Sequence, residues 1–371
     1  MQLSEEDSLR LNVLATASEA IRVDENQMAV FGLGDSGEHR VDLKPMGNTD
    51  RYLRAVREAL STLALGTPGG YPVFIRRWTR SGALGTERLG KLLCLGEPEA
   101  VVAVAASPAL TDSLALRAWW CLPTPEVARL MLQSESVRDG EAGPILVTYL
   151  LEHLPFETST RDIIDVVKLI LRSDLAKASA LDALWTRAQR AVPYRVGFLA
   201  AGPRYLAQAA DLRMDPDYGG DPKSGSAKSC TEWALSTAGR HFFSHCAFAL
   251  KKATDMECVV DTLNVMNKWL RPLRPELTLP RSADSLLSHA SGRLAELQCP
   301  TTSADANGFS ALSDETGLAL IVLSLAGEPL VAPVFARTDA TGSLMRKKLA
   351  PALAPVLAAL AQLTGEHGGI D

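Results

Sequence analysis

The sequence predicts a mainly α protein with a small N-terminal β-meander, an α-solenoid-like helical-repeat middle and a helical C-terminal region. In residues 95–212, short apolar helical segments recur in pairs of roughly 30 residues, the size of an α-helical repeat unit. A residue that ends a helix closes each pair, because Gly lacks a side chain and Pro lacks an amide donor. These closing residues are Gly96, Pro123, Pro155 and Pro193. Residues 20–44 instead hold three short β-prone runs separated by turn residues.

One stretch without apolar periodicity sets the predicted domain boundaries. Residues 214–228 are dominated by Pro, Gly, Ser, Asp and Lys, a composition typical of a linker. The chain is therefore predicted to comprise an N-terminal segment with the β-meander, a helical-repeat domain, a linker and a C-terminal helical domain. Their predicted bounds are 1–45, 46–213, 214–228 and 229–371.

The elements follow in order. Residues 1–18 fit a helix or a strand, and the helix is favoured; AIRVD, QMAVFGL and HRVDL are the three predicted strands. Residues 49–65 give the clearest helix, since Asn48 or Thr49 can cap it and its apolar residues fall on one face. Further helices are expected near 86–95, 98–106, 111–121, 125–133, 143–153, 160–172, 176–190, 194–201, 203–212, 229–252, 255–271, 282–298, 315–325, 328–336 and 343–363.

Composition describes an ordinary globular chain without a strong electrostatic bias. Its 371 residues are 47% apolar and 22% charged, with a net charge of −5. The net charge therefore gives the whole chain no electrostatic attraction to nucleic acid or to a membrane surface. The N-terminus lacks the apolar region of a signal peptide, and no apolar run reaches the length of a spanning helix. The six cysteines are scattered without a CxxC motif, which is typical of buried reduced thiols. A cytoplasmic protein that does not contact the membrane is expected.

Two glycine-rich stretches approach nucleotide-binding motifs and fail on their context. Gly32 to Gly37 matches GxGxxG, but the following EHRVDL alternates like a strand where a dinucleotide site needs a helix. Residues 220–229 resemble a phosphate loop, but Ser226 and Ala227 separate the lysine from the second glycine. A hairpin turn and a linker are the favoured interpretations, and no cofactor is expected.

The ligand-like cluster His241, His245, Cys246 and Cys258 also has an ordinary interpretation. Histidines four residues apart share a helix face, which suits a metal ion. No carboxylate accompanies them, and three phenylalanines surround them in the sequence, so packing is favoured and no metal is expected.

An arginine cluster is the one partner signal. Residues 1–50 carry ten acids and four bases, a net −6, whereas residues 51–88 carry seven bases and two acids, a net +5. The candidate partner-binding residues are Arg51, Arg54, Arg57, Arg76, Arg77 and Arg80. The last three are expected on a helix that begins at YPVFIRRWTR, and antiparallel packing of this helix on 49–65 would bring the two groups near one another. One alternative is a solvated face that pairs with the acidic N-terminal segment. The other is a surface for RNA or for an acidic protein.

Several long strings carry a resemblance to a known family. LGTPGGYPVFIRRWTR, LGEPEAVVAVAASPALTDSLALRAWWCLPTPEVARLML and GPILVTYLLEHLPFE resemble DsrS, a cytoplasmic protein encoded with the reverse dissimilatory sulfite reductase system of sulfur-oxidising bacteria. The resemblance covers most of residues 10–210 and, more loosely, the C-terminal ARTDATGSLMRKKL. It implies an accessory role in sulfur oxidation, in regulating or maturing that system, and it brings no catalytic motif.

The favoured function is therefore a non-enzymatic, regulatory or accessory protein of sulfur oxidation that binds a macromolecular partner, most simply another protein. A solenoid would present a broad face for such a partner. RNA binding through the arginines is a further possibility. The alternative from another class is a thiol-dependent enzyme or sulfur-transfer protein built on one of the six cysteines.

Overall fold

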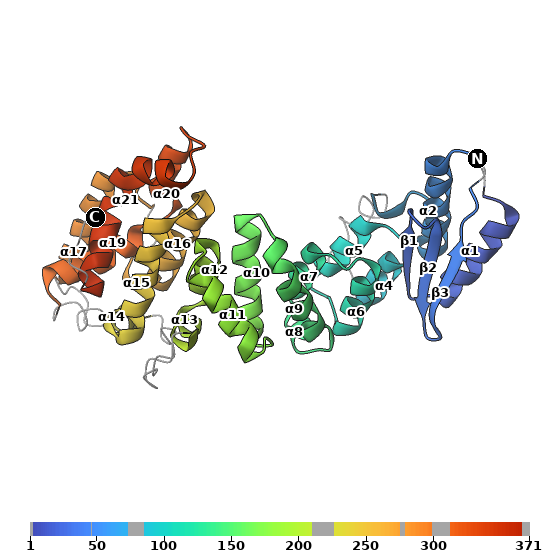
Figure 1. Cartoon of the computed structure of the whole chain (residues 1–371), viewed down its shortest axis with the longest axis horizontal. Coiled ribbons are helices and arrows are strands. Elements are labelled where there is room, and N and C mark those ends of the chain that lie inside the picture. The colour runs from blue at the N-terminus through green and yellow to red at the C-terminus, as the bar shows by residue number, and fades with distance from the viewer. Residues whose placement is uncertain are drawn as a thin grey trace. The chain divides into compact units, whose positions relative to one another are not determined.

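A computed structural model describes residues 3–45, 47–72, 85–209, 226–274, 279–298 and 312–365. The described part is mainly helical with a small N-terminal antiparallel sheet, which confirms the predicted fold class (Figure 1). The chain divides into two compact units, Met1–Pro155 and Phe156–Asp371, and the predicted repeat segment 46–213 contributes to both. The α-solenoid remains a prediction. Residues 214–225 of the predicted linker lie outside the described residues.

The three-stranded meander of unit 1 matches its prediction. Strands β1 (Ala20–Asp24), β2 (Ala29–Gly34) and β3 (Gly37–Asp42) pair antiparallel in the order β1-β2-β3. The GxGxxG stretch is the β2–β3 hairpin, as predicted, and Gly37 adopts φ +100°. A Cβ at Gly34 would lie 2.1 Å from the backbone oxygen of Ala17, so this glycine allows the close approach of the preceding chain.

Two helices complete the core of unit 1. They are α1 (Glu5–Ala17) and α2 (Thr49–Leu65), and side chains from both join those of the sheet in one apolar cluster. The Tyr52 hydroxyl donates a buried 2.7 Å hydrogen bond to Asp7, which ties α2 to α1. Burial, reinforced by that carboxylate, raises the pKa of Tyr52 well above its usual range.

The rest of unit 1 is a series of short helices. Their bounds are α4 Thr86–Leu93, α5 Pro98–Ala105, α6 Asp112–Cys121, α7 Pro125–Met131, α8 Glu135–Arg138 and α9 Ala142–His153, followed by the 3-10 turn η1, Leu154–Phe156. Asp112 accepts hydrogen bonds from the amides of Glu141 and Ala142 and so caps α9 from another helix. Trp119 and Trp120, adjacent residues of α6, are both partly exposed.

Unit 2 is helical throughout its described residues. Its bounds are α10 Thr160–Ser173, α11 Ala178–Ala188, α12 Val192–Ala201, α13 Pro203–Ala209, α14 Ala227–Leu235, α15 Thr237–Lys252, α16 Met256–Trp269, η3 Arg271–Leu273, α17 Ala283–Gln298, α19 Asp314–Leu325, α20 Glu328–Phe335 and α21 Gly342–Thr364. The prediction of one long helix over 229–252 is wrong. The first helix, α14, ends at Leu235, and the hydroxyl of Ser236 caps a new helix, α15.

The basic run near the start of α21 has a structural explanation. The helix begins at Gly342, so Arg346 lies beyond its first turn, and its guanidinium donates to the Ala253 carbonyl at the end of α15. A cation at the C-terminus of a helix is favourable. No external acidic partner is needed to explain this arginine.

One apolar helix pair of unit 2 has the composition of a membrane segment. Among the described helices, none is long and apolar enough to cross a membrane alone. α19 and α20 meet the length and composition criteria together, with a 60° bend between them. Most of α19 is buried in unit 2, where it packs on α16, α17 and α21.

Candidate arginine face and pocket of α2

The fold places the predicted arginines on the outer side of α2. Asn48 caps this helix by accepting from the Arg51 amide, and Gly66, at φ +72°, ends it. The buried side of α2 is occupied by Tyr52, Leu53, Val56 and Leu60. Because Arg51 and Arg54 lie on another side of the helix, both are exposed to solvent.

The three arginines of α2 differ in their partners. Arg57 is half-buried and forms an ion pair with Glu25, which comes from the acidic N-terminal segment. Arg51 and Arg54 have no ion pair within the part of the chain that the structure describes. Pairing with the protein's own acids, one of the two alternatives predicted for the cluster, therefore accounts for Arg57 alone among the three arginines of α2.

The second arginine group cannot be placed. Arg76, Arg77 and Arg80 lie outside the described residues, as does the helix that was expected to carry them. The expected proximity of the two groups therefore stays a prediction.

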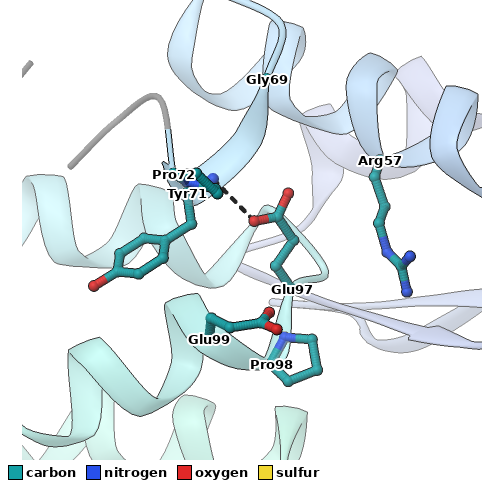
Figure 2. Close-up of a pocket in the computed structure, with 7 residues that line it drawn as sticks. All are labelled: Arg57, Gly69, Tyr71, Pro72, Glu97, Pro98 and Glu99. Atoms are coloured by element: carbon teal, nitrogen blue, oxygen red, sulfur yellow. Dashed lines mark hydrogen bonds between the residues drawn. The ribbon is translucent and has the colours of Figure 1, made fainter. Parts of the chain in front are cut away.

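A pocket of about 680 Å³ adjoins Arg57 and was not predicted (Figure 2). Arg57 comes from α2, Gly69, Tyr71 and Pro72 from the segment that follows α2, and Glu97, Pro98 and Glu99 from the start of α5. Figure 2 shows the Tyr71 ring and the Arg57 guanidinium on opposite sides of the two glutamates. We call this the α2 pocket.

The floor of the α2 pocket is held by backbone hydrogen bonds. The Glu97 carboxylate accepts from the Tyr71 amide at 2.9 Å, and the Ser61 hydroxyl accepts from the Gly70 amide at 2.9 Å. Glu97 crowds Gly70 so closely that a Cβ there would lie 2.0 Å from a carboxylate oxygen, and Gly70 also has a positive φ. Glu97 therefore shapes the loop, whereas Glu99 is exposed at the pocket rim.

Sequence reasoning missed the pocket for a physical reason. Glu97 and Glu99 read as ordinary first-turn acids of a helix, and no local pattern indicates that a loop 26 residues earlier returns to them.

The described cysteines do not form a thiol site. Cys121, Cys230, Cys246 and Cys258 are buried, and Cys94 is partly buried. Burial raises the pKa of Cys94 to about 11 and that of Cys121, Cys230 and Cys258 to about 12, and it raises the pKa of Cys246 well above its ordinary value. These thiols stay protonated at neutral pH, so none is a ready nucleophile. Cys299 lies outside the described residues.

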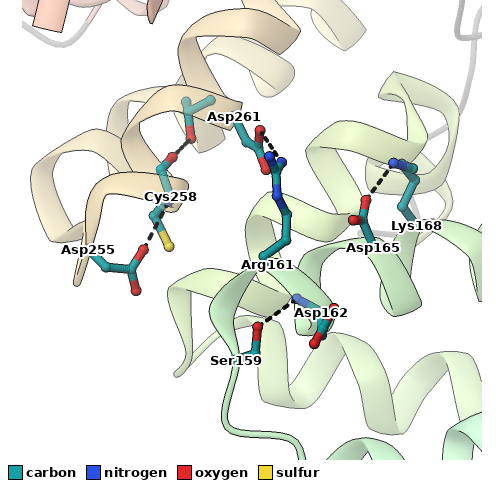
Figure 3. A network of polar contacts seen from close by, with 9 residues as sticks. Ser159, Arg161, Asp162, Asp165, Lys168, Asp255, Cys258 and Asp261 are labelled. Atoms are coloured by element: carbon teal, nitrogen blue, oxygen red, sulfur yellow. Dashed lines mark hydrogen bonds and ion pairs between the residues drawn. The ribbon is translucent and has the colours of Figure 1, made fainter. Parts of the chain in front are cut away.

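Cys258 illustrates how burial overrides position. It lies in the first turn of α16, where a helix N-terminus ordinarily favours a thiolate. Its amide instead donates to the capping carboxylate of Asp255 (Figure 3). That carboxylate also accepts from the Thr160 hydroxyl at 2.6 Å. The nearby Asp255 charge adds to burial in opposing the thiolate.

The same region holds charged groups that are already paired. Arg161 contacts Asp261 at 3.5 Å, and Lys168 contacts Asp165 at 2.7 Å (Figure 3). Burial raises the pKa of Asp261, and Arg161 partly opposes that shift. The Arg161–Asp261 contact joins α10 to α16, and the Lys168–Asp165 contact lies within α10. Both indicate a structural role.

The histidine pair lies in unit 2 and lacks further ligands. His241 and His245 contact each other through their Nε2 atoms at 3.1 Å. Within the described residues, no group of three or more His, Cys, Asp or Glu side chains is arranged to hold a metal ion.

No protein-family model, curated protein or solved structure matches this chain.

Proposed function

We propose that this chain is a non-catalytic accessory or regulatory protein that binds an acidic segment of another protein through Arg51 and Arg54 of α2. The observation that carries the proposal is the exposure of these two guanidiniums, which have no ion pair among the described residues. A guanidinium donates two parallel hydrogen bonds to one carboxylate, which suits recognition of Asp and Glu side chains.

The α2 pocket extends this surface. Tyr71, Pro72 and Pro98 form an apolar wall of the pocket, next to Arg57 on the arginine face of α2, by which we mean Arg51, Arg54 and Arg57. The apolar side chains of a bound acidic segment could be buried against this wall. Asp50 and Glu58 are also exposed on α2, so attraction would depend on the two guanidiniums individually and not on the net charge of the helix.

The sulfur-oxidation role rests on the DsrS resemblance alone. The alternative, a thiol-dependent enzyme or sulfur carrier, receives no support from the five described cysteines, because four are buried and burial keeps all five protonated at neutral pH. The burial and protonation of these thiols favour a binding role over thiol chemistry.

The test uses fluorescein-labelled poly-L-glutamate as a model acidic segment, with fluorescence anisotropy in about 50 mM salt, where charge contacts are strong. We expect binding by the native chain, weakening with salt, and at least a tenfold loss in Arg51→Glu/Arg54→Glu. The matched control is Arg187→Glu/Arg190→Glu, which reverses two exposed arginines of unit 2 and should bind like the native chain.

Equal losses in both double variants, or no binding by the native chain, would contradict the proposal. Selective binding of poly-U over poly-L-glutamate would favour the RNA alternative instead. The sulfur-oxidation role has its own test, which is co-purification of the tagged chain with components of the reverse sulfite reductase system from a sulfur-oxidising bacterium. That co-purification should be lost in Arg51→Glu/Arg54→Glu.

A further inference from the structure

Unit 2 buries an arginine without a carboxylate partner among the described residues. Arg195 of α12 is 7% exposed, and its Nε donates to the Ala188 carbonyl at the C-terminus of α11 at 2.9 Å. Its guanidinium lies 3.8 Å from the ring centroid of Phe248 and 3.1 Å, through Nη1, from Nδ1 of His245. A helix C-terminus, an aromatic face and a nitrogen lone pair thus replace water around this charge.

The donor inventory fixes the protonation of both histidines. Arginine can only donate, so Nδ1 of His245 must accept and its Nε2 must carry the proton. That Nε2–H then donates to Nε2 of His241, which must be unprotonated. The chain Arg195 to His245 to His241 is therefore intact only while both imidazoles are neutral.

We propose that Arg195, His245 and His241 form a pH-sensitive latch that holds α15 on α12 at neutral pH and releases it in mild acid. A proton on Nδ1 of His245 would face the guanidinium, donor against donor. A proton on Nε2 of His241 would face the Nε2–H of His245 in the same way. Either event breaks the chain and places a second positive charge in a buried site.

The electrostatic surroundings offer no compensation. The charges that act on the two imidazoles, among the described residues, are those of Arg195 and of the histidines themselves. From α11 come only the neutral Trp185 ring, 5.4 Å from that of His245, and the Ala188 carbonyl. No described carboxylate on α13, α14, α16 or α21, which also pack on α15, acts on the pair.

The direction of the pH effect follows from the pKa shifts of the two histidines. Burial, then the neighbouring positive groups, lowers the pKa of His245 to about 3, and burial with Arg195 lowers the pKa of His241. In an opened α15 both would titrate near their ordinary value of about 6.5. The opened state therefore binds more protons, so the latch is fully stable above that pH and loses stability as the pH falls below it.

Cys246 reports this opening because it is buried on α15, directly after His245. The rate at which 4,4′-dithiodipyridine labels Cys246 in the native full chain, divided by the rate for an unstructured cysteine peptide at the same pH, measures the opening equilibrium. Between pH 6 and pH 5, two histidines that titrate only when open should raise this ratio up to about 60-fold. One such histidine should raise it about eightfold.

His241→Gln and His245→Gln are the matched variants, because glutamine can accept and donate in the chain without titrating in this range. Each should reduce the rise to about eightfold, and the double variant should abolish it. Arg195→Gln keeps a donor and removes a charge that lowers the pKa of both histidines, so it should make the rise at Cys246 between pH 6 and pH 5 shallower. A merely structural loss of packing would instead raise labelling at every pH by the same factor. Cys121, buried in unit 1, is the internal control and should show a much shallower rise.

A rise at Cys246 of less than about threefold in the native chain, or the same rise in the double glutamine variant, would overturn the latch. Should the variants fail to fold, imidazole 15N chemical shifts of the native protein decide the matter. The latch requires the Nε2–H tautomer at His245 and the Nδ1–H tautomer at His241 at neutral pH. Any other pair of tautomers, or a protonated His245 at pH 6, would overturn it.

Discussion

Arg54 of α2 and Arg195 of α12 are two arginines without a carboxylate partner among the described residues, and the protein treats them in opposite ways. Arg54 lies in water, where its charge is solvated and available to a ligand. Arg195 is enclosed, and its solvation is supplied by the Ala188 carbonyl, the His245 lone pair and the Phe248 ring.

The difference shows that an unpaired charge has two distinct meanings. An exposed unpaired cation costs little to keep and can recruit an anion. A buried one is tolerated only while its neutral neighbours stay neutral, so it makes its surroundings sensitive to protonation. We therefore expect Arg54 to act in binding and Arg195 to act in a response to pH.

The sharpest test of this comparison is truncation at each arginine. Arg195→Ala leaves two buried acceptors without a donor and removes the stacking on Phe248, so we expect a loss of roughly 2–4 kcal/mol in the free energy of unfolding. Arg54→Ala should change it by less than about 0.5 kcal/mol. Urea denaturation followed by tryptophan fluorescence measures both, and equal effects would remove the distinction.

A second test compares two helical glycines of unit 2. A Cβ at Gly197 of α12 would lie 2.6 Å from Cβ of Val167 on α10, whereas a Cβ at Gly292 of α17 meets nothing within 4 Å. Gly197→Ala should therefore cost about 1–3 kcal/mol in unfolding free energy through overpacking. Gly292→Ala should gain about 0.5–1 kcal/mol from helix propensity, and thermal unfolding of both variants checks the opposite signs.

The sequence predicted elements well where local signals agree. The Asn48 cap, the apolar face of α2 and the terminal Gly66 all act within one helix, and the helix appears at the predicted bounds. The error at 229–252 arose because Ser236 was read as an ordinary helical residue. Its role as the cap of α15 depends on Gly239, whose Cβ would lie 2.3 Å from the Trp233 carbonyl.

The sites were harder to predict because they depend on contacts between distant segments. The i, i+4 spacing of His241 and His245 was visible in the sequence, where packing was favoured over a metal site. Arg195, fifty residues earlier, gave no sign that it would meet them. For the arginines of α2, the composition of residues 1–50 indicated an internal acid partner, but only the fold assigns Glu25 to Arg57.

The smallest expected effect concerns that ion pair between Arg57 and Glu25. Both side chains are substantially exposed, at 35% and 52%, so their attraction acts through water and is screened by salt. A double-mutant cycle with Arg57→Ala and Glu25→Ala should give a coupling of about 0.2–1 kcal/mol at low salt, falling toward zero at about 1 M salt. A coupling well above 1 kcal/mol would mean that the pair is a structural clasp and that the arginine face begins only at Arg54. With a weak coupling, Glu25→Ala should instead free Arg57 and strengthen poly-L-glutamate binding about twofold. Unchanged binding would restrict the partner surface to Arg51 and Arg54.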